Sequence, residues 1–369
     1  MKQTGIYVHV PFCDKKCPYC DFYSKKGSEP LYDAYTAALQ QKITASVYRG
    51  RYTADTLYFG GGTPGLLGGK RLSLLVQAVR ESFALDTNEA EVTVEVNPTR
   101  NDPGFETMRQ AGVNRISIGL QSAVDEELRL LGRHHTAEQA LACVRQARNA
   151  GFENISLDLM IALPGQTKES LKQSVDFCAA AQAEHISAYI LKIEPHTLFY
   201  RRRDSMSLPD DDQAADLYEY LCELMRRYGY AHYEISNFCK NGRQGKHNLK
   251  YWRDEEYLGF GPSAHSFIDG KRFYCPRSME DFEQDRMVSD GDGGSEQEYI
   301  MLALRLAEGL SAARFARRFG YVLPRQYYRK VPALRSAGLV RVLEDGGFAL
   351  TEKGFLVSNA IIAEVLDEI

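Results

Sequence analysis

Residues 5–20 read GIYVHVPFCDKKCPYC, an apolar stretch that leads directly into three closely spaced cysteines. The apolar part is rich in β-branched residues and ends at a proline, which predicts a strand over Gly5–Val10. Cys13, Cys17 and Cys20 follow in the spacing C-x3-C-x2-C. Ligating side chains on the loop after a first strand are typical of folds whose sites lie at the carboxyl ends of parallel strands.

Outward from this strand, short apolar stretches alternate with segments that carry apolar residues at helical spacing, as far as about residue 195. The predicted strands are Gly5–Val10, Thr56–Phe59, Glu91–Asn97, Arg115–Leu120, Ile155–Leu163 and Ile186–Ile193. The predicted helices between them include Leu31–Tyr48, Lys70–Phe83, Ala137–Ala150 and Glu169–Ala181. This alternation predicts an α/β fold, with helices outside a parallel sheet. Six units with the unusual residues just after the strands predict a partial (β/α)6 barrel, and a doubly wound open sheet is the alternative.

The chain divides into three predicted parts. The barrel occupies residues 1–230, and an irregular, aromatic and Gly-rich extension occupies residues 231–290. A linker, Ser289–Ser295 (SDGDGGS), leads to a C-terminal domain over residues 296–369. That domain is predicted to have helices followed by a hairpin, in the manner of a small winged helix. Its predicted elements are the helices Glu298–Leu306, Ala312–Phe319 and Pro324–Ala337 and the hairpin strands Leu339–Val342 and Phe348–Thr351.

Charge and hydropathy exclude several classes of protein. The 369 residues include 45 Lys and Arg against 49 Asp and Glu, a formal net charge of −4. This balance argues against wholesale binding to nucleic acid, although residues 309–343 carry basic and no acidic side chains. The chain has no run of about 18 apolar residues, the length that spans a membrane. The polar N-terminus does not resemble a secretory signal, so we expect a cytoplasmic protein.

Three of the eight cysteines are clustered, and in a reducing cytoplasm such a group favours a metal or iron–sulfur site over disulfides. Three thiolates can hold three irons of a 4Fe–4S cube and leave the fourth iron open to a small molecule. The alternative is a zinc knuckle completed by His9. The remaining cysteines are expected to be small buried side chains; they are Cys143, Cys178, Cys222, Cys239 and Cys275.

A second loop, Gly60-Gly61-Gly62-Thr63-Pro64, follows the second predicted strand. It lacks the Lys-Ser/Thr end of a phosphate-binding P-loop and the spacing of a dinucleotide fingerprint. Three successive glycines predict a close approach between the backbone and a ligand. A plain turn between a strand and a helix is the alternative.

Four polar side chains lie in or just after later strands. They are Glu95 in VTVEVNP, Gln121 at the end of ISIGLQS, Arg133 in LGRHHT and Asp158 inside ISLDLMIALPG. A charged side chain in an apolar strand is costly unless it is paired or holds a ligand. A barrel would aim these four side chains inward, so they are candidate binding residues, with internal ion pairs as the alternative.

The cysteine spacing after the first strand resembles the radical S-adenosylmethionine (SAM) superfamily. The resemblance implies a 4Fe–4S cluster on the three cysteines, with its free iron bound to the amino and carboxylate groups of SAM. It also implies that Tyr19 lies beside the cluster and that the glycine loop meets the SAM amino group. It further implies that Arg133 binds the SAM carboxylate. Glu95, Gln121 and Asp158 would then bind the amino group and the ribose hydroxyl groups.

Longer motifs resemble a narrower family, the oxygen-independent coproporphyrinogen dehydrogenases. They are Tyr7-x-His9-x-Pro11-Phe12-Cys13, YFGGGTP (58–64), LQS (120–122), DLMIALPGQT (158–167) and GFGPSAHS (259–266). The dehydrogenases proper carry a further cysteine two residues after the third ligand and an N-terminal extension, whereas this chain has Phe22 and only twelve residues before Cys13. Both departures match the other branch, the HemW-type heme chaperones. The resemblance also places Tyr7 among the cofactor-binding residues.

The segment KNGRQGKHNLKYW, residues 240–252, contains the only tryptophan of the chain. Its His247-Asn248-x-x-Tyr251-Trp252 matches the HNxxYW motif of the heme chaperones. An imidazole is a common axial ligand of heme iron, and aromatic side chains can cover a porphyrin face. His247, Tyr251 and Trp252 are therefore candidate heme-binding residues, with Arg243, Lys246 or Lys250 for the propionates. The alternative is a surface loop whose aromatic side chains pack into the barrel mouth.

Three hypotheses follow. The leading one is a heme chaperone that carries a 4Fe–4S cluster and SAM, has no catalytic residue of its own, and delivers heme to client proteins. The resemblance implies clients such as respiratory-chain or heme-storage proteins, peripheral contact with the inner face of the membrane, and a homodimer. The second is an active radical-SAM enzyme acting on coproporphyrinogen or another tetrapyrrole. The third, which we favour least, is nucleic-acid binding through residues 309–343.

Overall fold

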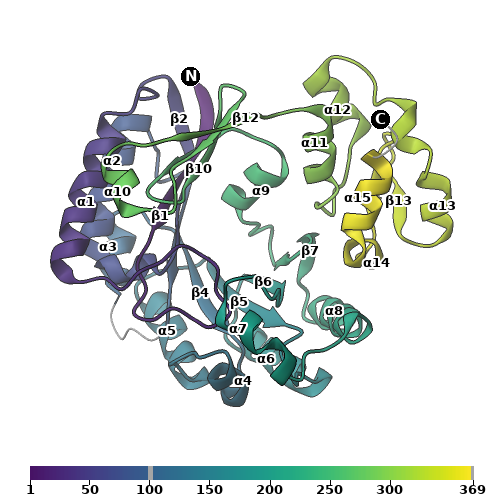
Figure 1. Ribbon diagram of the computed structural model, residues 1–369, viewed down its shortest axis with the longest axis horizontal. Helices are drawn as coiled ribbons and strands as arrows, with labels where there is room; N and C mark the ends of the chain where they lie inside the picture. The colour runs from purple at the N-terminus through teal and green to yellow at the C-terminus, as the bar shows by residue number, and fades with distance from the viewer. Residues whose placement is uncertain (99–102, 367–369) are drawn as a thin grey trace.

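Six parallel strands form the centre of the fold in a computed structural model that describes residues 1–98 and 103–366 (Figure 1). They are β1 (Lys2–Val10), β2 (Tyr52–Gly61), β3 (Glu91–Val96), β4 (Arg115–Gln121), β5 (Ile155–Ile161) and β6 (His185–Ile190). Each strand pairs in parallel with the next one along the chain. The doubly wound alternative is therefore wrong, because that topology needs a point at which the strand order reverses. The predicted partial barrel is confirmed.

Helices cover the outer face of this curved sheet (Figure 1). They are α1 (Glu29–Thr44), α2 (Gly68–Phe83), α3 (Phe105–Gln110), α4 (Asp125–Leu130), α5 (Ala137–Asn149), α6 (Lys168–Ala180) and α8 (Asp211–Arg227). Thr136 and Thr167 begin α5 and α6 with capping boxes, which satisfy backbone N–H groups that the helix itself leaves unpaired. The four helices predicted in this region are present with small shifts at their ends.

The inner face of the barrel is partly open to solvent, whereas the outer face is not. Strand residues that point outward, such as Leu57 and Ile118, are fully buried beneath the helices. On the inner face, residues toward the carboxyl ends of the strands remain half-buried or exposed; they include Tyr7, Tyr58, Glu95, Asp158 and Tyr189. Residues nearer the amino ends on the same face, such as Thr56, Arg115 and His185, are buried. The interior of the barrel is therefore packed toward the amino ends of the strands and open toward their carboxyl ends.

Short strands extend both edges of the sheet within residues 231–290, which we predicted to be irregular. β9 (Tyr257–Phe260) pairs with β1, and β8 (Asn237–Cys239) pairs with β6. The others are β7 (Ala231–Glu234), β10 (His265–Ile268), β11 (Lys271–Tyr274) and β12 (Val288–Asp292). The predicted linker Ser289–Ser295 is thus largely strand β12, paired with β11. These strands are too short for an alternating pattern to appear in the sequence.

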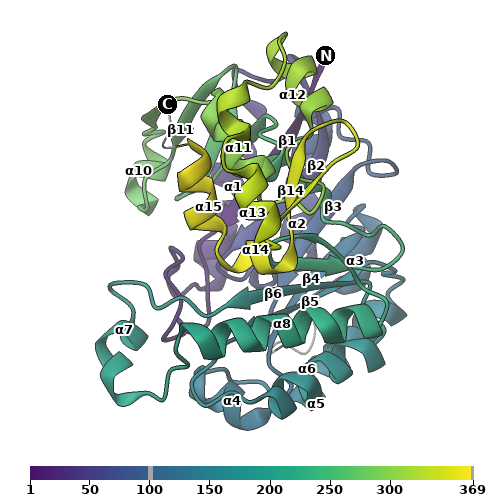
Figure 2. The same cartoon turned by 90° about the vertical axis from the view of Figure 1, so that its right-hand side faces the viewer.

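The C-terminal domain consists of helices around a two-stranded hairpin (Figure 2). It contains α11 (Glu296–Ala303), α12 (Ala312–Phe319), α13 (Val331–Ser336), β13 (Val340–Val342), β14 (Phe348–Leu350), α14 (Glu352–Leu356) and α15 (Ser358–Leu366). The hairpin is confirmed, but the single helix predicted over Pro324–Ala337 is wrong. It is divided into a 3-10 turn, Arg325–Tyr328, and α13. Pro332 explains the break, because proline fits the first turn of a helix but not its interior.

Two expectations about composition are met. All five scattered cysteines are buried, as predicted for small apolar side chains. Among the described residues, no helix has the length and apolar character needed to cross a membrane.

Candidate functional site

A cavity of about 370 Å³ lies at the carboxyl ends of the barrel strands. Its lining brings together most of the residues predicted from the sequence. They come from loops and strands that lie up to 145 residues apart, from Cys13 to Asp158. These residues are Cys13, Cys17, Tyr19, Cys20, Gly61, Gly62, Thr63, Glu95, Gln121, Arg133 and Asp158. Of the predicted barrel residues, Tyr7 and Gly60 do not line this cavity.

The cysteine loop is held in place by its own backbone and by the neighbouring glycine loop. The Cys20 N–H donates to the Cys17 carbonyl over 3.1 Å, and the Cys13 N–H donates to Lys25 over 3.0 Å. The Cys13 Sγ and Thr63 Oγ1 atoms lie 3.7 Å apart. All three thiols are free and only half-buried. They are therefore available to ligate a cluster from one side of the cavity.

His9 does not complete a zinc site with these cysteines. Its Nδ1 lies 3.1 Å from the Tyr7 hydroxyl and its Nε2 lies 3.0 Å from the Tyr23 carbonyl. Burial lowers the pKa of His9 to about 4, so the ring is neutral at physiological pH. Both ring nitrogens are thus engaged away from the thiols.

Each residue of the glycine triplet has a packing reason to lack a side chain. A Cβ on Gly60 would lie 2.9 Å from the Tyr58 ring, and one on Gly61 would lie 2.5 Å from the His9 ring. A Cβ on Gly62 would lie 2.5 Å from the Phe12 carbonyl oxygen, at the start of the cysteine loop. The triplet therefore brings the two loops into contact, and Gly61 and Gly62 also border the cavity.

Two half-buried carboxyl groups face the cavity. Burial raises the pKa of Glu95 to about 7 and that of Asp158 to about 6. Glu95 accepts a 2.7 Å hydrogen bond from the Tyr58 hydroxyl, and Asp158 accepts one of 3.0 Å from Ser117. A cationic group placed against them would favour their charged forms. This wall therefore suits a ligand that carries an amine.

Arg133 and Gln121 lie at the end of β4, between the strands that carry Glu95 and Asp158. The Arg133 guanidinium donates to the Gly119 carbonyl over 2.8 Å and contacts the Asn97 side chain, while its buried Nε has no hydrogen-bond partner among the described residues. Gln121 has a φ of +69°, an uncommon conformation for a residue other than glycine. An unsatisfied guanidinium N–H is costly, and a carboxylate would satisfy it.

These observations fit the groups that the sequence implies. Free thiols, an unsatisfied guanidinium and two carboxyl groups surround one cavity, so its residues match a thiolate-held cluster and an amino acid head group. Reasoning from the sequence missed further lining residues, among them Asn97, Ser117, Gly119, Met160 and Tyr189. A signal exists for Asn97, Gly119 and Met160, because each stands two residues along the chain from a predicted residue and so shares its face.

The segment that contains the HNxxYW motif is a short helix, α9 (Lys246–Trp252), and not a loop. It lies at the other end of the barrel, against the amino ends of the first strands. The backbone N–H groups of Lys246 and His247 donate to the carboxylate of Glu91, the first residue of β3, over 2.9 and 3.0 Å. Figure 1 shows α9 between the sheet and α11 of the C-terminal domain.

His247 is fully buried, and both of its ring nitrogens are engaged. Nδ1 lies 2.8 Å from Thr56 Oγ1 and Nε2 lies 2.8 Å from the Tyr251 hydroxyl. The ring stacks on Tyr58 with centroids 5.3 Å apart. Burial lowers its pKa to about 3, so the imidazole is neutral. Lys250 is also committed, because it forms a 2.7 Å ion pair with Asp55.

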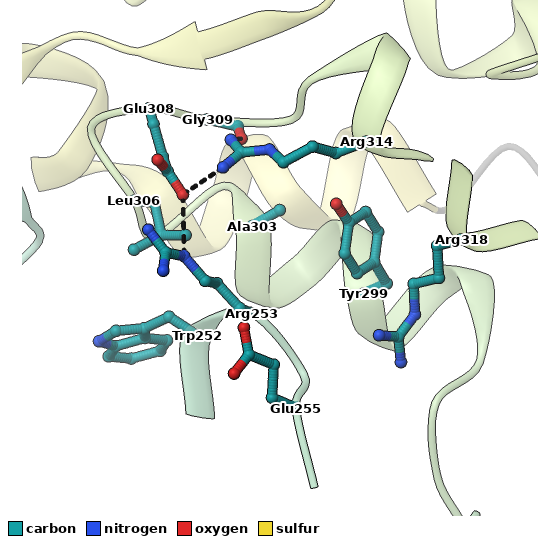
Figure 3. Close-up of a pocket in the computed structure, with 10 residues that line it drawn as sticks. All are labelled: Trp252, Arg253, Glu255, Tyr299, Ala303, Leu306, Glu308, Gly309, Arg314 and Arg318. Atoms are coloured by element: carbon teal, nitrogen blue, oxygen red, sulfur yellow. Dashed lines mark hydrogen bonds and ion pairs between the residues drawn. The ribbon is translucent and has the colours of Figure 1, made fainter. Parts of the chain in front are cut away.

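Trp252 points the other way, into a pocket of about 360 Å³ between α9 and the C-terminal domain (Figure 3). Arg253 and Arg314 both pair with Glu308 across this pocket, the first at 3.2 Å. The lining also includes Arg318 and the ring of Tyr299. The pocket thus offers an aromatic wall and three guanidinium groups.

The cavity and α9 are joined by a column of contacting side chains. Glu95 bonds to the Tyr58 hydroxyl, Tyr58 stacks on His247, and His247 bonds to the Tyr251 hydroxyl. Every member of the column is buried or half-buried. These contacts connect the lining of the cavity with α9.

The basic stretch 309–343 is partly neutralised within the protein. Arg314 pairs with Glu308, and Arg318 pairs with Asp254 at 2.6 Å. Arg341 donates to the Ala307 carbonyl over 2.6 Å. The two ion pairs reduce the free positive charge that binding to nucleic acid would need, and the hydrogen bond holds the Arg341 side chain against the protein.

A partial barrel with a three-cysteine loop after its first strand defines the class of radical-SAM proteins. A model of the Radical SAM superfamily matches residues 7–178, and a model of the HemN C-terminal domain matches residues 297–357. The structure of coproporphyrinogen III oxidase (HemN) from Escherichia coli, described as a radical SAM enzyme, superposes with a TM-score of 0.83. It covers 100% of this chain and 91% of its own at 23% identity, a likeness of fold.

Relatives define the family more narrowly. The heme chaperone HemW of Bacillus subtilis is 35% identical over 99% of this chain and 100% of its own length. The heme chaperone HemW of Escherichia coli is 40% identical over 72% of this chain and 71% of its own length. The chain belongs to the HemW family of heme chaperones. Membership in the radical-SAM superfamily implies a 4Fe–4S cluster and SAM.

Proposed function

We propose that this protein binds heme through α9 and delivers it to heme-requiring proteins. The observation that carries the proposal is the HNxxYW motif on α9, between the barrel and the C-terminal domain, in a chain that aligns end to end with heme chaperones. The clients are respiratory-chain or heme-storage proteins in the cytoplasm or at the inner face of the membrane. Heme transfer is carried out by a homodimer.

The cavity at the carboxyl ends of the strands holds the cluster and SAM in this proposal. Cys13, Cys17 and Cys20 ligate the cluster, with Tyr19 beside it. Arg133 offers its unpaired Nε to the SAM carboxylate, and the wall of Glu95 and Asp158 receives the amine and the ribose hydroxyls. The loop Gly60–Thr63 and Gln121 close the remaining sides. The bound cluster and SAM supply reductive cleavage chemistry. Tyr7 lies behind the lining and contacts His9, whose ring packs against Gly61.

The heme iron binds to His247 after α9 moves away from the barrel. The neutral imidazole is the form that ligates iron, but the Tyr251 hydroxyl occupies Nε2 in the structure described above. Iron binding therefore requires that this hydrogen bond break. The porphyrin then lies against Trp252. Arg253 and Arg314, which pair with Glu308 in the structure, bind the propionates in its place.

Replacing Tyr251 with phenylalanine tests this step. The variant keeps the aromatic ring but frees Nε2, and a hydrogen bond of about 1 kcal/mol corresponds to roughly fivefold tighter heme binding. The measurement is a titration of purified protein with heme, followed at the Soret band. Tyr257→Phe is the matched control, because its hydroxyl accepts from Arg272 and does not contact His247. Weaker binding by Tyr251→Phe than by the control would contradict a role for His247 as the iron ligand.

The second candidate function is that of a radical-SAM enzyme acting on a tetrapyrrole, which the complete cavity favours. Phe22 replaces the additional cysteine of the dehydrogenases and is 64% exposed at the edge of the cavity. We therefore expect that the protein with its cluster, SAM and a reductant does not convert coproporphyrinogen III anaerobically. Chromatography of the porphyrin products and of 5′-deoxyadenosine checks this expectation. Formation of protoporphyrinogen with matching deoxyadenosine would establish the enzyme instead.

A further inference from the structure

A second group of metal-ligating side chains lies far from the cysteine loop. Cys222 of α8, His232 of β7 and Glu352 of α14 each offer one ligand atom, and these atoms all lie within 4.8 Å of one another. Cys222 is buried and the other two side chains are half-buried. The group lies where α14 of the C-terminal domain contacts α8 of the barrel (Figure 2).

His232 supplies an independent sign that a ligand is missing here. Its Nε2 atom is buried and has no hydrogen-bond partner among the described residues. The ring stacks on Phe238 with centroids 4.3 Å apart, and the edge of Phe355 packs against it at 5.2 Å. These contacts hold the imidazole in place. A buried polar atom left unsatisfied is uncommon in folded proteins, and a bound ion would satisfy it.

The donor set determines which ion fits. One sulfur, one nitrogen and one carboxylate oxygen are the ligands that zinc takes, and hard cations such as magnesium prefer oxygen alone. The Nε2 atom of His232 has no hydrogen-bond partner among the described residues, so it is free to ligate. We propose that Cys222, His232 and Glu352 bind a zinc-like divalent cation that ties the C-terminal domain to the barrel.

One neighbour competes with the ion. Arg226 pairs with the Glu352 carboxylate, and its side chain is 58% exposed. The exposed guanidinium can turn into solvent when a cation takes its place. Tyr218, the other polar neighbour of Cys222, already donates its hydroxyl to the Ile235 carbonyl over 2.9 Å. Three protein ligands then leave one position for water or for a group from a partner, as in open zinc sites.

The test is zinc binding by the full chain with its iron–sulfur cluster in place, so that the cysteine loop does not take up the metal. The protein is dialysed anaerobically against buffered zinc, and the zinc and iron contents of the same sample are then measured. We expect about one zinc ion per chain in the wild type. Cys222→Ala and His232→Phe should weaken zinc binding by roughly 100-fold or more, because even loss of an outer partner costs up to that much.

Cys143→Ala is the matched control, since Cys143 is also a buried thiol whose pKa is raised to about 12 but has no such neighbours. It should bind zinc as the wild type does. Arg226→Gln removes the competing charge from an exposed position, so it should tighten binding and raise the thermal unfolding midpoint in zinc. Equal zinc in the wild type and Cys222→Ala, or weaker binding by Arg226→Gln, would overturn the proposal.

Discussion

Replacing Cys17 with alanine is expected to remove the iron–sulfur cluster almost completely. Cys17 lies between the other two ligands, its backbone carbonyl receives the Cys20 N–H, and its sulfur lies 3.6 Å from Arg133 Nη1. Two thiolates cannot hold a cubane that needs three from this loop, because no other free thiol lines the described part of the cavity. The iron content after reconstitution should fall from about four per chain to well below one.

The measurement is iron and sulfide content together with the visible absorbance of the reconstituted protein. Cys178→Ala is the control, since Cys178 is a fully buried cysteine on α6. It should reconstitute like the wild type. A Cys17→Ala variant with a full complement of iron would show that the cluster is held elsewhere.

Replacing Arg133 with alanine should have the next largest effect, on SAM binding. The Arg133 guanidinium is anchored by the Gly119 carbonyl, and its buried Nε has no hydrogen-bond partner among the described residues. Loss of one partner from a buried charge pair costs about 2–5 kcal/mol, which corresponds to a rise in the dissociation constant of about 30-fold to several thousand-fold. Arg133→Lys should bind SAM at an intermediate strength, because it keeps the charge but not the forked geometry.

Anaerobic calorimetry or equilibrium dialysis of the cluster-loaded protein measures this effect. Arg129→Ala is the control, since Arg129 is 69% exposed and pairs with Glu126 on the same helix. Iron content is measured for each variant, because Arg133 also contacts Cys17. Unchanged SAM affinity in an Arg133→Ala protein with a full cluster would remove this residue from the site.

The sequence predicted the barrel and the cavity well, for a physical reason. Parallel strands converge at their carboxyl ends, so residues just after successive strands meet even when they are far apart in the chain. Glu95, Arg133 and Asp158 were predicted in this way and line one cavity with the cysteines. Ser117 was missed because a serine inside a strand gives no signal by its polarity alone.

The α9 region was predicted less well. The motif identified His247 but gave no sign that its two ring nitrogens are bonded to Thr56 and Tyr251, since Thr56 lies 191 residues away. Lys250 was a candidate for the propionates, yet it is buried in an ion pair with Asp55. Tertiary contacts of this kind depend on how α9 docks on β2, which has no local pattern.

The group of Cys222, His232 and Glu352 could not be predicted from the sequence, because it too depends on tertiary contacts. Its first two members are ten residues apart and the third lies in another domain. Zinc motifs are found in sequences by short, regular spacings, and this group has none. Only the packing of α14 against α8 brings the three side chains together.

Titration with heme of His247→Ala beside His185→Ala tests the central claim most directly. His185 is the closest match in the chain, because it is also fully buried, with a serine hydroxyl 2.8 Å from Nδ1 and a tyrosine hydroxyl 2.8 Å from Nε2. Loss of either ring should cost stability to a similar degree. Only the loss of His247 should alter heme binding, with a dissociation constant raised about tenfold or more and a shifted Soret band. Binding by His247→Ala with the affinity and spectrum of the wild type would contradict the account.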